Sequence, residues 1–508
     1  MASALAVYEP SVMAYEKMME KYAVASKPTM RMVLPINNGT FATTGANIIR
    51  FNLTAPSGLV SFSESYLSFR VTNASGADMS PDFSAFSFFN RVRVIAPGGA
   101  IIQDLQHINL YINQMMIAKA DPEWLKSKGS FMGCSDDAVM YSGTKKAQIA
   151  SAGTRDYVLP LSMFKGIFDT EAFLPLFFTP TGLTIEFTIE DDPVACIGSG
   201  MASSGGDYNL SLVQMHIQEV SLDSEVKGAI ASKLASAGGI MIQGEDYQHI
   251  PSSNAGAETE VIIRLDGHAT SVKSVFAFVR PNGDDGGDPA TYHGVFDKAS
   301  PTLSCTSNRY FTGLYLTNGG VQYPTAKIDT VPKLYAETLK ALGDSLTSAR
   351  VTGKVTYTNY SDTTDHVYPT ATYAGYDRGV SGWALASTAG TLTSTAGTIT
   401  DLTLTEGTPN TLSSGTIEVT SGALTITSGT VTPTYEGTYA PLTTGGVIGL
   451  DTESFVKDAD KIRSGMMQDN MSLTFNWSGT RLPRRYDVYC LRDCSYIFQP
   501  DGTIVQKI

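Results

Sequence analysis

From about residue 30 onward, apolar and polar residues alternate along the chain with a period of two. Residues 49–54 and 67–72 show this alternation. The clearest case places Thr184, Glu186, Thr188 and Glu190 between Leu183, Ile185, Phe187 and Ile189. Successive side chains of a β-strand point to opposite faces, so each segment predicts a strand with one buried and one wetter face. The pattern recurs at 213–217 and predicts that a first β domain ends near residue 222.

A second series of strands begins after a stretch of small residues at 227–239. The alternation restarts at 261–265 and 272–279. It closes with 471–477, then 486–491, then a hairpin that turns at Pro500, Asp501 and Gly502. The last strands are far in sequence from the first strands of this series, and such long-range pairing favours a Greek-key sandwich over a simple meander. The sequence therefore predicts two similar β domains in tandem.

Helical spacing interrupts the strand pattern once in each half of the chain. One helix is predicted at about 105–119 and another at about 332–342. The second has Pro332 just inside its start and Gly343 just past its end, which is the usual placement of these residues at helix termini.

Residues 10–24 form a third amphipathic segment, with apolar residues at helical spacing at Val12, Tyr15, Met19 and Tyr22. Two interpretations stay open for this segment. It is either a helix packed on its own domain or an arm that contacts a neighbour or an inner surface.

The stretch between Lys354 and Lys457 contains no lysine and one arginine, Arg378. It repeats a Thr-rich unit with Gly turns every six to twelve residues, and apolar residues alternate with Thr inside the repeats. This pattern predicts a small β insertion in the second domain and not a disordered linker. We expect residues 371–441 to form an outward β projection, which we call the tower.

Composition and charge restrict the function further. The chain has 508 residues, of which 42% are hydrophobic and 17% charged, with a formal net charge of -13. A negative balance opposes coating of a phosphate backbone, so no direct sequence-specific nucleic-acid partner is expected. Five scattered cysteines favour a reducing compartment. The start lacks the features of a signal peptide, and no run of 18 apolar residues predicts a membrane-spanning helix.

Candidate chemistry is sparse. The minimal residues of a phosphate loop, a zinc protease and a hydrolase elbow are missing, so no catalytic residue, cofactor site or metal site is predicted. Cys490 and Cys494 are interpreted as buried or half-buried thiols and not as a metal knuckle. The carboxylates of residues 282–288 are interpreted as a surface turn that lacks the distal Glu of a calcium loop. His216 is expected on the solvated face of its strand, and Ser224 with Lys227 is a chance Ser-x-x-Lys match.

Several segments, in order, resemble the double jelly-roll major capsid proteins of the tectivirus and adenovirus lineage, with the closest pattern in virophages and Polinton-like viruses. Residues 89–106 are similar to the family's strand, Gly turn and strand leading into a helix, here at 107–118. Residues 164–193 resemble its Leu-Pro-Leu stretch before a long strand with an acidic end. Residues 270–280, and Tyr323 with Pro324 before a helix ending at Leu342 and Gly343, look like landmarks of the second jelly roll.

The resemblance implies an all-β chain of two tandem eight-stranded jelly rolls with short helices. The implied domains are an arm at 1–28, a first jelly roll at 29–225 and a second at 226–508 that carries the tower at 371–441. The implied role is a non-enzymatic shell subunit, made inside a host cell and located in the virion. It would form pseudo-hexagonal homotrimers that tile an icosahedral shell.

Expected partners are copies of the chain itself, penton and minor capsid proteins, an inner membrane reached by the arm, and a host receptor reached by the tower. The alternative is a secreted or cell-surface β-rich adhesin or polysaccharide-acting protein, because β-sandwiches support many functions.

Overall fold

The computed structural model describes residues 26–281, 311–343, 447–453 and 465–508, together with five short strands between residues 392 and 432. Within these ranges the gaps are 38, 56–57, 76–78, 82, 121–123, 125–126, 135–148, 171, 180, 192–194, 199–205, 255–257 and 479–483. The predicted helix at 10–24 lies outside the described residues, as does most of the predicted tower.

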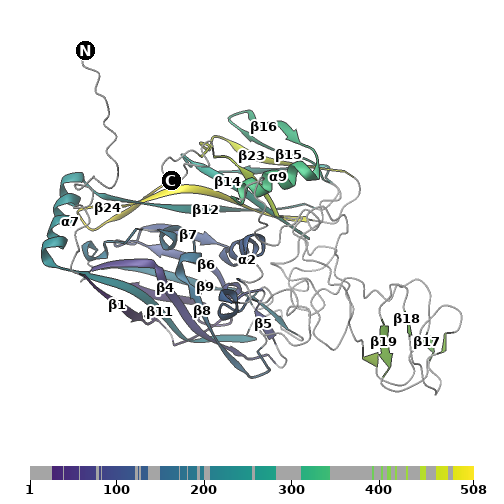
Figure 1. Cartoon of the computed structure of the whole chain (residues 1–508), viewed down its shortest axis with the longest axis horizontal. Helices are drawn as coiled ribbons and strands as arrows, with labels where there is room; N and C mark the ends of the chain where they lie inside the picture. The colour runs from purple at the N-terminus through teal and green to yellow at the C-terminus, as the bar shows by residue number, and fades with distance from the viewer. Residues whose placement is uncertain are drawn as a thin grey trace, which may run out of the picture.

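The first half of the chain folds into two facing sheets, one of five strands and one of four (Figure 1). One sheet has the order β1 (Ser26–Val33), β11 (Tyr208–Leu222), β4 (Gly58–Asn73) and β8 (Thr154–Pro160), with β2 (Thr40–Ala42) also paired to β11. The other has the order β3 (Ile48–Leu53), β9 (Leu183–Ile189), β6 (Phe89–Ile95) and β7 (Ile101–Gln106). Two further short strands, β5 (Met79–Pro81) and β10 (Cys196–Gly198), pair with each other.

Aromatic side chains fill the space between these two sheets. Phe89 lies at the centre, with its ring centroid 5.2 Å from Phe69, 5.6 Å from Phe187 and 6.3 Å from Phe164. All four side chains are buried. The alternating apolar residues of β4, β6 and β9 all point into this core, which is why the period of two could be read from the sequence.

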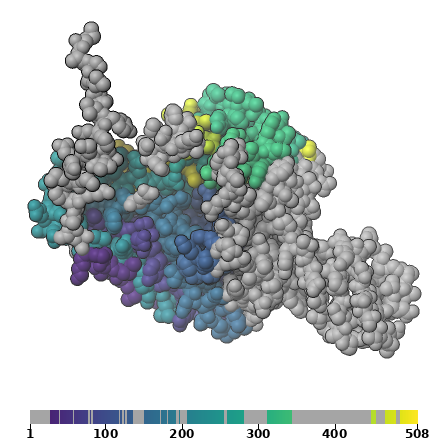
Figure 2. Space-filling model, viewed as in Figure 1, coloured from purple at the N-terminus to yellow at the C-terminus, as the bar shows by residue number. Residues whose placement is uncertain are grey.

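The second half repeats the arrangement. One sheet has the order β12 (Ile240–Asn254), β24 (Arg484–Phe498), β14 (Val272–Pro281) and β22 (Val447–Asp451), with β25 (Ile504–Lys507) also paired to β24. The other has the order β13 (Glu260–Leu265), β23 (Met471–Trp477), β15 (Phe311–Asn318) and β16 (Val321–Ile328). The chain thus forms two tandem eight-stranded jelly rolls, as predicted. The second packs over the first, as the ribbon and the space-filling drawing of the same view show (Figures 1 and 2).

Three longer helices accompany the strands in the part of the chain that the structure describes. They are α2 (Ile108–Lys119), α7 (Ser224–Ala237) and α9 (Val331–Ala341), and short helical turns lie at α4 (Lys128–Phe131), η1 (Ala85–Phe88), η2 (Leu161–Met163), η3 (Gly166–Asp169) and η4 (Leu176–Phe178). The predicted 332–342 helix is confirmed as α9. Gly343, just past its end, has a φ of 77°, the left-handed conformation that a terminating glycine supplies. The helix predicted from residue 105 begins at Ile108, because β7 continues to Gln106.

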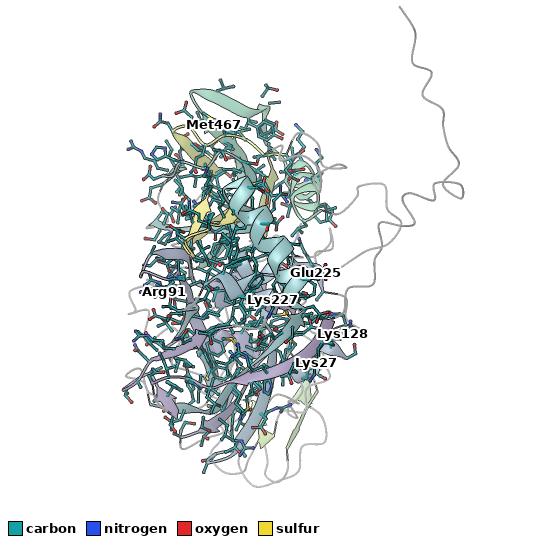
Figure 3. The ribbon with its side chains drawn as sticks, turned by 90° about the vertical axis from the view of Figure 1, so that its left-hand side faces the viewer. Lys27, Arg91, Lys128, Glu225, Lys227 and Met467 are labelled. Atoms are coloured by element: carbon teal, nitrogen blue, oxygen red, sulfur yellow. The ribbon has the colours of Figure 1, made fainter. Side chains whose placement is uncertain are left out.

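The sequence pattern missed α7. The small residues at 227–239 carry little apolar periodicity, but residues 227–237 lie within a 14-residue helix that connects β11 to β12 (Figure 3, with Glu225 and Lys227 labelled). Alanine has the highest intrinsic helix propensity, and Gly238 ends the helix with a φ of 71°. Few large apolar residues mark one face, so the helix leaves a weak periodic signal.

Short strands occur inside the predicted insertion. Strand β17 (Leu392–Thr393) pairs with β20 (Glu418–Val419), while β19 (Pro409–Leu412) pairs with both β18 (Leu402–Thr403) and β21 (Val431–Thr432). Strand pairing inside this segment agrees with a β insertion. The outward placement of the tower, and the domain boundaries given above, stay predictions.

Candidate functional site: the seam between the jelly rolls

The two jelly rolls meet along a continuous contact, which we call the seam. Strand β12 of the second jelly roll packs on β7 and η3 of the first. Three tyrosine hydroxyls of the second jelly roll donate hydrogen bonds across it. Tyr247 donates to the carbonyl of Gln106 (3.1 Å), Tyr489 to that of His107 (3.0 Å) and Tyr496 to Oε1 of Gln103 (3.4 Å).

Stacked rings fill the middle of the seam. Tyr111 of α2 lies 4.8 Å from the ring centroid of Tyr247 and 5.2 Å from that of Tyr489. All three side chains are buried, and burial raises the pKa of Tyr247 well above its ordinary value. The Tyr247 hydroxyl therefore stays protonated and donates its hydrogen bond across the seam. A buried aromatic contact with satisfied polar ends indicates that the jelly rolls form one unit.

A buried histidine and aspartate lie beside these rings. His249 Nε2 is 3.0 Å from Asp487 Oδ1, and the side chains are 2% and 0% exposed. The His107 ring, from the first jelly roll, lies 4.6 Å from that of His249. Burying a carboxylate costs much less free energy when it has a hydrogen-bonding partner than when it is isolated. Asp487 and His249 therefore satisfy each other next to the seam.

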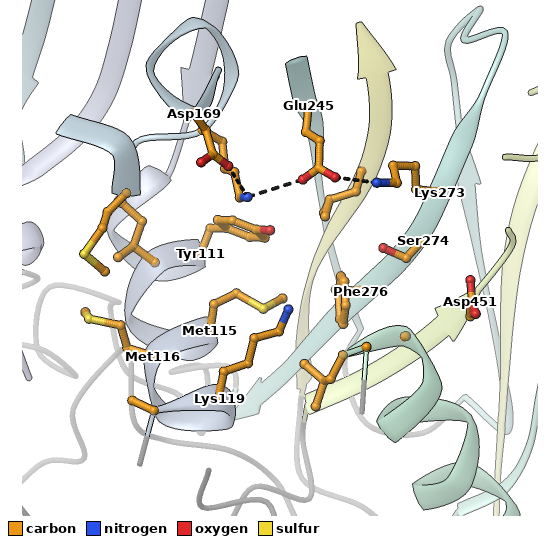
Figure 4. A pocket seen from close by; sticks show the side chains of 18 of the residues that line it. Tyr111, Met115, Met116, Lys119, Asp169, Glu245, Lys273, Ser274, Phe276 and Asp451 are labelled. Carbon is orange, nitrogen blue, oxygen red and sulfur yellow. Dashed lines mark hydrogen bonds and ion pairs between the residues drawn. The ribbon is translucent and has the colours of Figure 1, made fainter. Parts of the chain in front are cut away.

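An ion chain crosses the seam next to the tyrosines. It runs from Asp169 through Lys165, Glu245 and Lys273 to Glu453 (Figure 4). The first two residues belong to the first jelly roll and the other three to the second. Lys165 Nζ is 3.3 Å from Glu245 Oε2, and Lys273 Nζ is 3.6 Å from Glu453 Oε1.

The centre of the ion chain is strongly biased toward the charged state. Burial alone would raise the pKa of Glu245, but the ammonium groups of Lys165 and Lys273 outweigh it and lower that pKa to about 2. Burial alone would lower the pKa of Lys165, but the facing carboxylates hold it above its ordinary value. Glu245 therefore stays ionised over the whole physiological pH range.

Below the ion chain the seam opens into a cavity of about 650 Å³. Its walls come from α2, β14, β24 and the end of α9, so both jelly rolls contribute (Figure 4). Tyr111, Lys165 and Glu245 form part of its lining, which places the ion chain at one side of the cavity.

A row of exposed apolar side chains marks the outer side of the first jelly roll. Met30 and Met32 of edge strand β1 are 49% and 51% exposed, and Leu34 and Ile36 continue the row at 55% and 59%. Met30 and Met32 occupy alternate positions of β1 and share one face of the strand, and Leu34 and Ile36 follow its last residue, Val33. We call this set the β1 row. Long exposed apolar edges are pairing hazards unless a partner covers them.

The residues singled out in the sequence do not gather in one place. Cys490 and Cys494 are buried and outside any disulfide, as predicted, and burial raises the pKa of Cys490 to about 12. His216 lies on the outer face, where its ring stacks on Tyr66 at 4.6 Å, and it is half-buried instead of fully solvated. Ser224 and Lys227 lie in the first turn of α7. Residues 282–288 lie outside the described residues.

The described residues contain no group of three His, Cys, Asp or Glu side chains placed to hold a metal ion. In the same ranges, no helix combines the length and hydropathy of a membrane span.

No pattern in the sequence points directly to the seam. Lys165 and Glu245 are 80 residues apart, and Tyr489 lies 382 residues from its partner His107. An indirect indication comes from the alternating segment at 486–491. Tyr486 and Tyr489 lie on opposite faces of this strand, which indicates that both of its faces are buried.

Comparison with solved structures identifies the architecture. PBCV-1 VP54, fitted into a reconstruction of the virophage Sputnik, superposes with a TM-score of 0.55, covering 96% of this chain and 98% of VP54 at 10% identity. This chain has the double jelly-roll fold of viral major capsid proteins. A second capsid-fold structure, the quasi-atomic PBCV-1 virus capsid, covers 95% and 97% with a TM-score of 0.53 at 10% identity. No family model and no curated protein matches the sequence.

Proposed function

We propose that this protein is a structural subunit of an icosahedral virus shell and not an enzyme. The observation that carries the proposal is the tandem pair of jelly rolls, which corresponds to VP54 along nearly the whole of both chains. The seam supports it, because buried tyrosines and the ion chain hold the two jelly rolls as one rigid building block.

The proposed assembly is a homotrimer with a pseudo-hexagonal outline. Three copies of a subunit with two similar lobes give six roughly equivalent lobes, and closed cyclic symmetry is the usual form of soluble oligomers. Obligate interfaces of this kind bury on the order of 2,000 Å² or more and are apolar. The proposal assigns the β1 row to the contact with a second copy, because burial there removes an exposed apolar edge.

The finer parts of the proposal concern segments outside the described residues. The arm at 1–28 is assigned to the inner side, where it contacts a neighbouring subunit or a lipid layer. The tower at 371–441 is assigned to the outer rim, where it faces a host receptor. Penton and minor capsid proteins are the proposed further partners. The proposed location is the virion, after synthesis and assembly inside the host cell.

Light scattering coupled to size-exclusion chromatography tests the trimer. The purified chain is expected to elute at three times its mass of 54.3 kDa. Met32→Asp, which puts a charge in the β1 row, should yield monomers with unchanged circular dichroism. Met467→Asp is the matched control, because Met467 is also exposed (63%) and lies on the second jelly roll away from β1 (Figure 3). A wild-type monomer at micromolar concentration would contradict the proposal, and a trimeric Met32→Asp variant would contradict the assignment of the β1 row.

A further inference from the structure

The cavity in the seam has the size of a ligand site. Its volume of about 650 Å³ lies within the range of about 300–1,000 Å³ that is typical of small-molecule pockets. Figure 4 shows side chains from both jelly rolls converging on it, with α2 on one side and β14 on the other. A molecule bound here would contact both jelly rolls at once.

Most of the cavity wall is apolar. Met115 and Met116 extend from α2, and Phe276 faces them from β14 (Figure 4). The wall also includes Ile112, Trp124, Met163, Leu342 and Leu491. Methionine side chains are flexible and polarisable, so they adapt to a chain-like ligand. An alkyl chain is the ligand part that suits this wall.

The charged groups of the wall are largely occupied by one another. Lys165 and Lys273 bind carboxylates of the ion chain, and Lys340 binds Glu337 at 2.6 Å. The carboxylate of Asp451 accepts the backbone NH of Glu453 at 3.0 Å. Asp451 is thus the one carboxylate of the wall without an ion pair in the described part of the chain, and burial raises its pKa.

Lys119 is the exception among the lysines of the wall. It lies in the last turn of α2 and extends its side chain into the cavity (Figure 4). No carboxylate in the described part of the chain forms an ion pair with it. Lys119 as a whole residue is exposed, but partial desolvation of its ammonium group, and then the neighbouring charge of Lys165, lower its pKa. The carboxylate of Glu245 raises this pKa and offsets only part of the two effects.

We propose that the seam cavity binds an amphipathic anion: a single alkyl chain against the apolar wall, with a carboxylate or phosphate head at Lys119. The head supplies the missing negative charge, and the chain replaces water against Met115, Met116 and Phe276. The ligand acts as an additional contact between the two jelly rolls. This inference goes beyond the shell function and does not depend on it, because the cavity is complete within one subunit.

Binding is measured on the purified full-length chain with 12-bromododecanoate below its micelle concentration. Bromine quenches tryptophan fluorescence by contact, and Trp124 lines the cavity. We expect saturable quenching that disappears in Trp124→Phe. Dodecyl phosphate should compete with the probe if a phosphate head is accepted as well. A short carboxylate such as butyrate should not compete, since it lacks the chain.

Charge recognition is tested with Lys119→Met, which keeps most of the side-chain volume and removes the ammonium group. We expect the Kd for 12-bromododecanoate to rise about tenfold or more, because a charge-assisted hydrogen bond is lost. The Kd for the neutral 12-bromododecanol should stay within about twofold. Lys128→Met is the matched control, since Lys128 is an exposed lysine of α4 outside the cavity.

Three results from the quenching and Lys119→Met experiments would overturn the proposal. They are an absence of saturable quenching, quenching that persists in Trp124→Phe, and equal Kd values for the acid in the wild type and in Lys119→Met. Equal affinity for the acid and the alcohol would also overturn it, because it would reduce the site to an apolar void. A loss of trimers with intact ligand binding would contradict only the shell proposal.

Discussion

The ion chain permits a quantitative test of what joins the two jelly rolls. Glu245→Gln keeps the shape of the central side chain and removes its charge. Lys165 then keeps Asp169 as its partner and Lys273 keeps Glu453, but the link between the two halves of the chain is lost. The variant should fold to the same structure with a lower free energy of unfolding.

The magnitude follows from the pKa of Glu245, which is lowered from 4.5 to about 2. One pKa unit corresponds to about 1.4 kcal/mol, so the charged state gains about 3 kcal/mol on folding at neutral pH. The side chain is 33% exposed, and solvent screens part of this energy. We therefore expect a loss of about 1.5–2 kcal/mol, which for a unit of 508 residues corresponds to a fall in Tm of about 1.5–2 °C.

The pH dependence of this stabilisation tests whether it comes from the charge of Glu245. The folded pKa lies below the unfolded one, so this stabilisation is present above about pH 4.5 and is lost as the pH falls toward 2. Scanning calorimetry of the wild type and Glu245→Gln at pH 7, 4 and 2.5 should give Tm values that converge with falling pH.

Asp329→Asn serves as the comparison variant, because Asp329 forms an exposed ion pair with Lys333 at 2.7 Å and should leave Tm unchanged. A Tm difference between the wild type and Glu245→Gln that is the same at pH 7 and pH 2.5 would refute the reasoning. It would assign the loss to packing instead of charge.

Three further changes test separate contacts. Gly166→Ala places a Cβ 1.6 Å from Nε2 of Gln103 at a φ of 79°, so the yield of folded protein should fall sharply. Gly98→Ala is the control, because Gly98 has a similar φ of 94° but open space around it, and this variant should fold. Equal yields of the two variants would contradict the clash with Gln103. Tyr247→Phe removes a hydrogen bond across the seam and should cost about 1 kcal/mol in denaturant unfolding. The Cys490 thiol, with its pKa raised to about 12, should react with iodoacetamide at pH 8 only after denaturation, as followed by mass spectrometry.

The strands were predictable because each jelly roll buries one face of each sheet. Leu183, Ile185 and Phe187 are all buried, as the alternation at 183–190 requires. The same pattern was wrong about Glu186, which was expected on the wetter face but is 5% exposed. Its carboxylate lies between Arg50 and Arg93, on the two neighbouring strands, and periodicity within one strand carries no information about such partners.

The seam was beyond sequence reasoning for the same reason. A lysine such as Lys119 or Lys273 follows the same local pattern whether it faces water or a cavity. Its environment is set by elements that arrive from distant parts of the chain. The β1 row shows the limit as well, because an alternating edge strand predicts a buried face but does not tell which side an assembly covers.

The position of β24 in the sheet has a consequence for synthesis on the ribosome. Strand β12 pairs along its whole length with β24, and Asn254 finds its partner in Arg484, 230 residues later. At about 5–20 residues per second, the edge of β12 waits on the order of 10–50 s for that partner. The first jelly roll can close before this interval, while the second stays incomplete. A nascent chain therefore passes through a defined period in which a half-built sheet needs protection from neighbouring chains, and translation speed between these two strands becomes a determinant of yield.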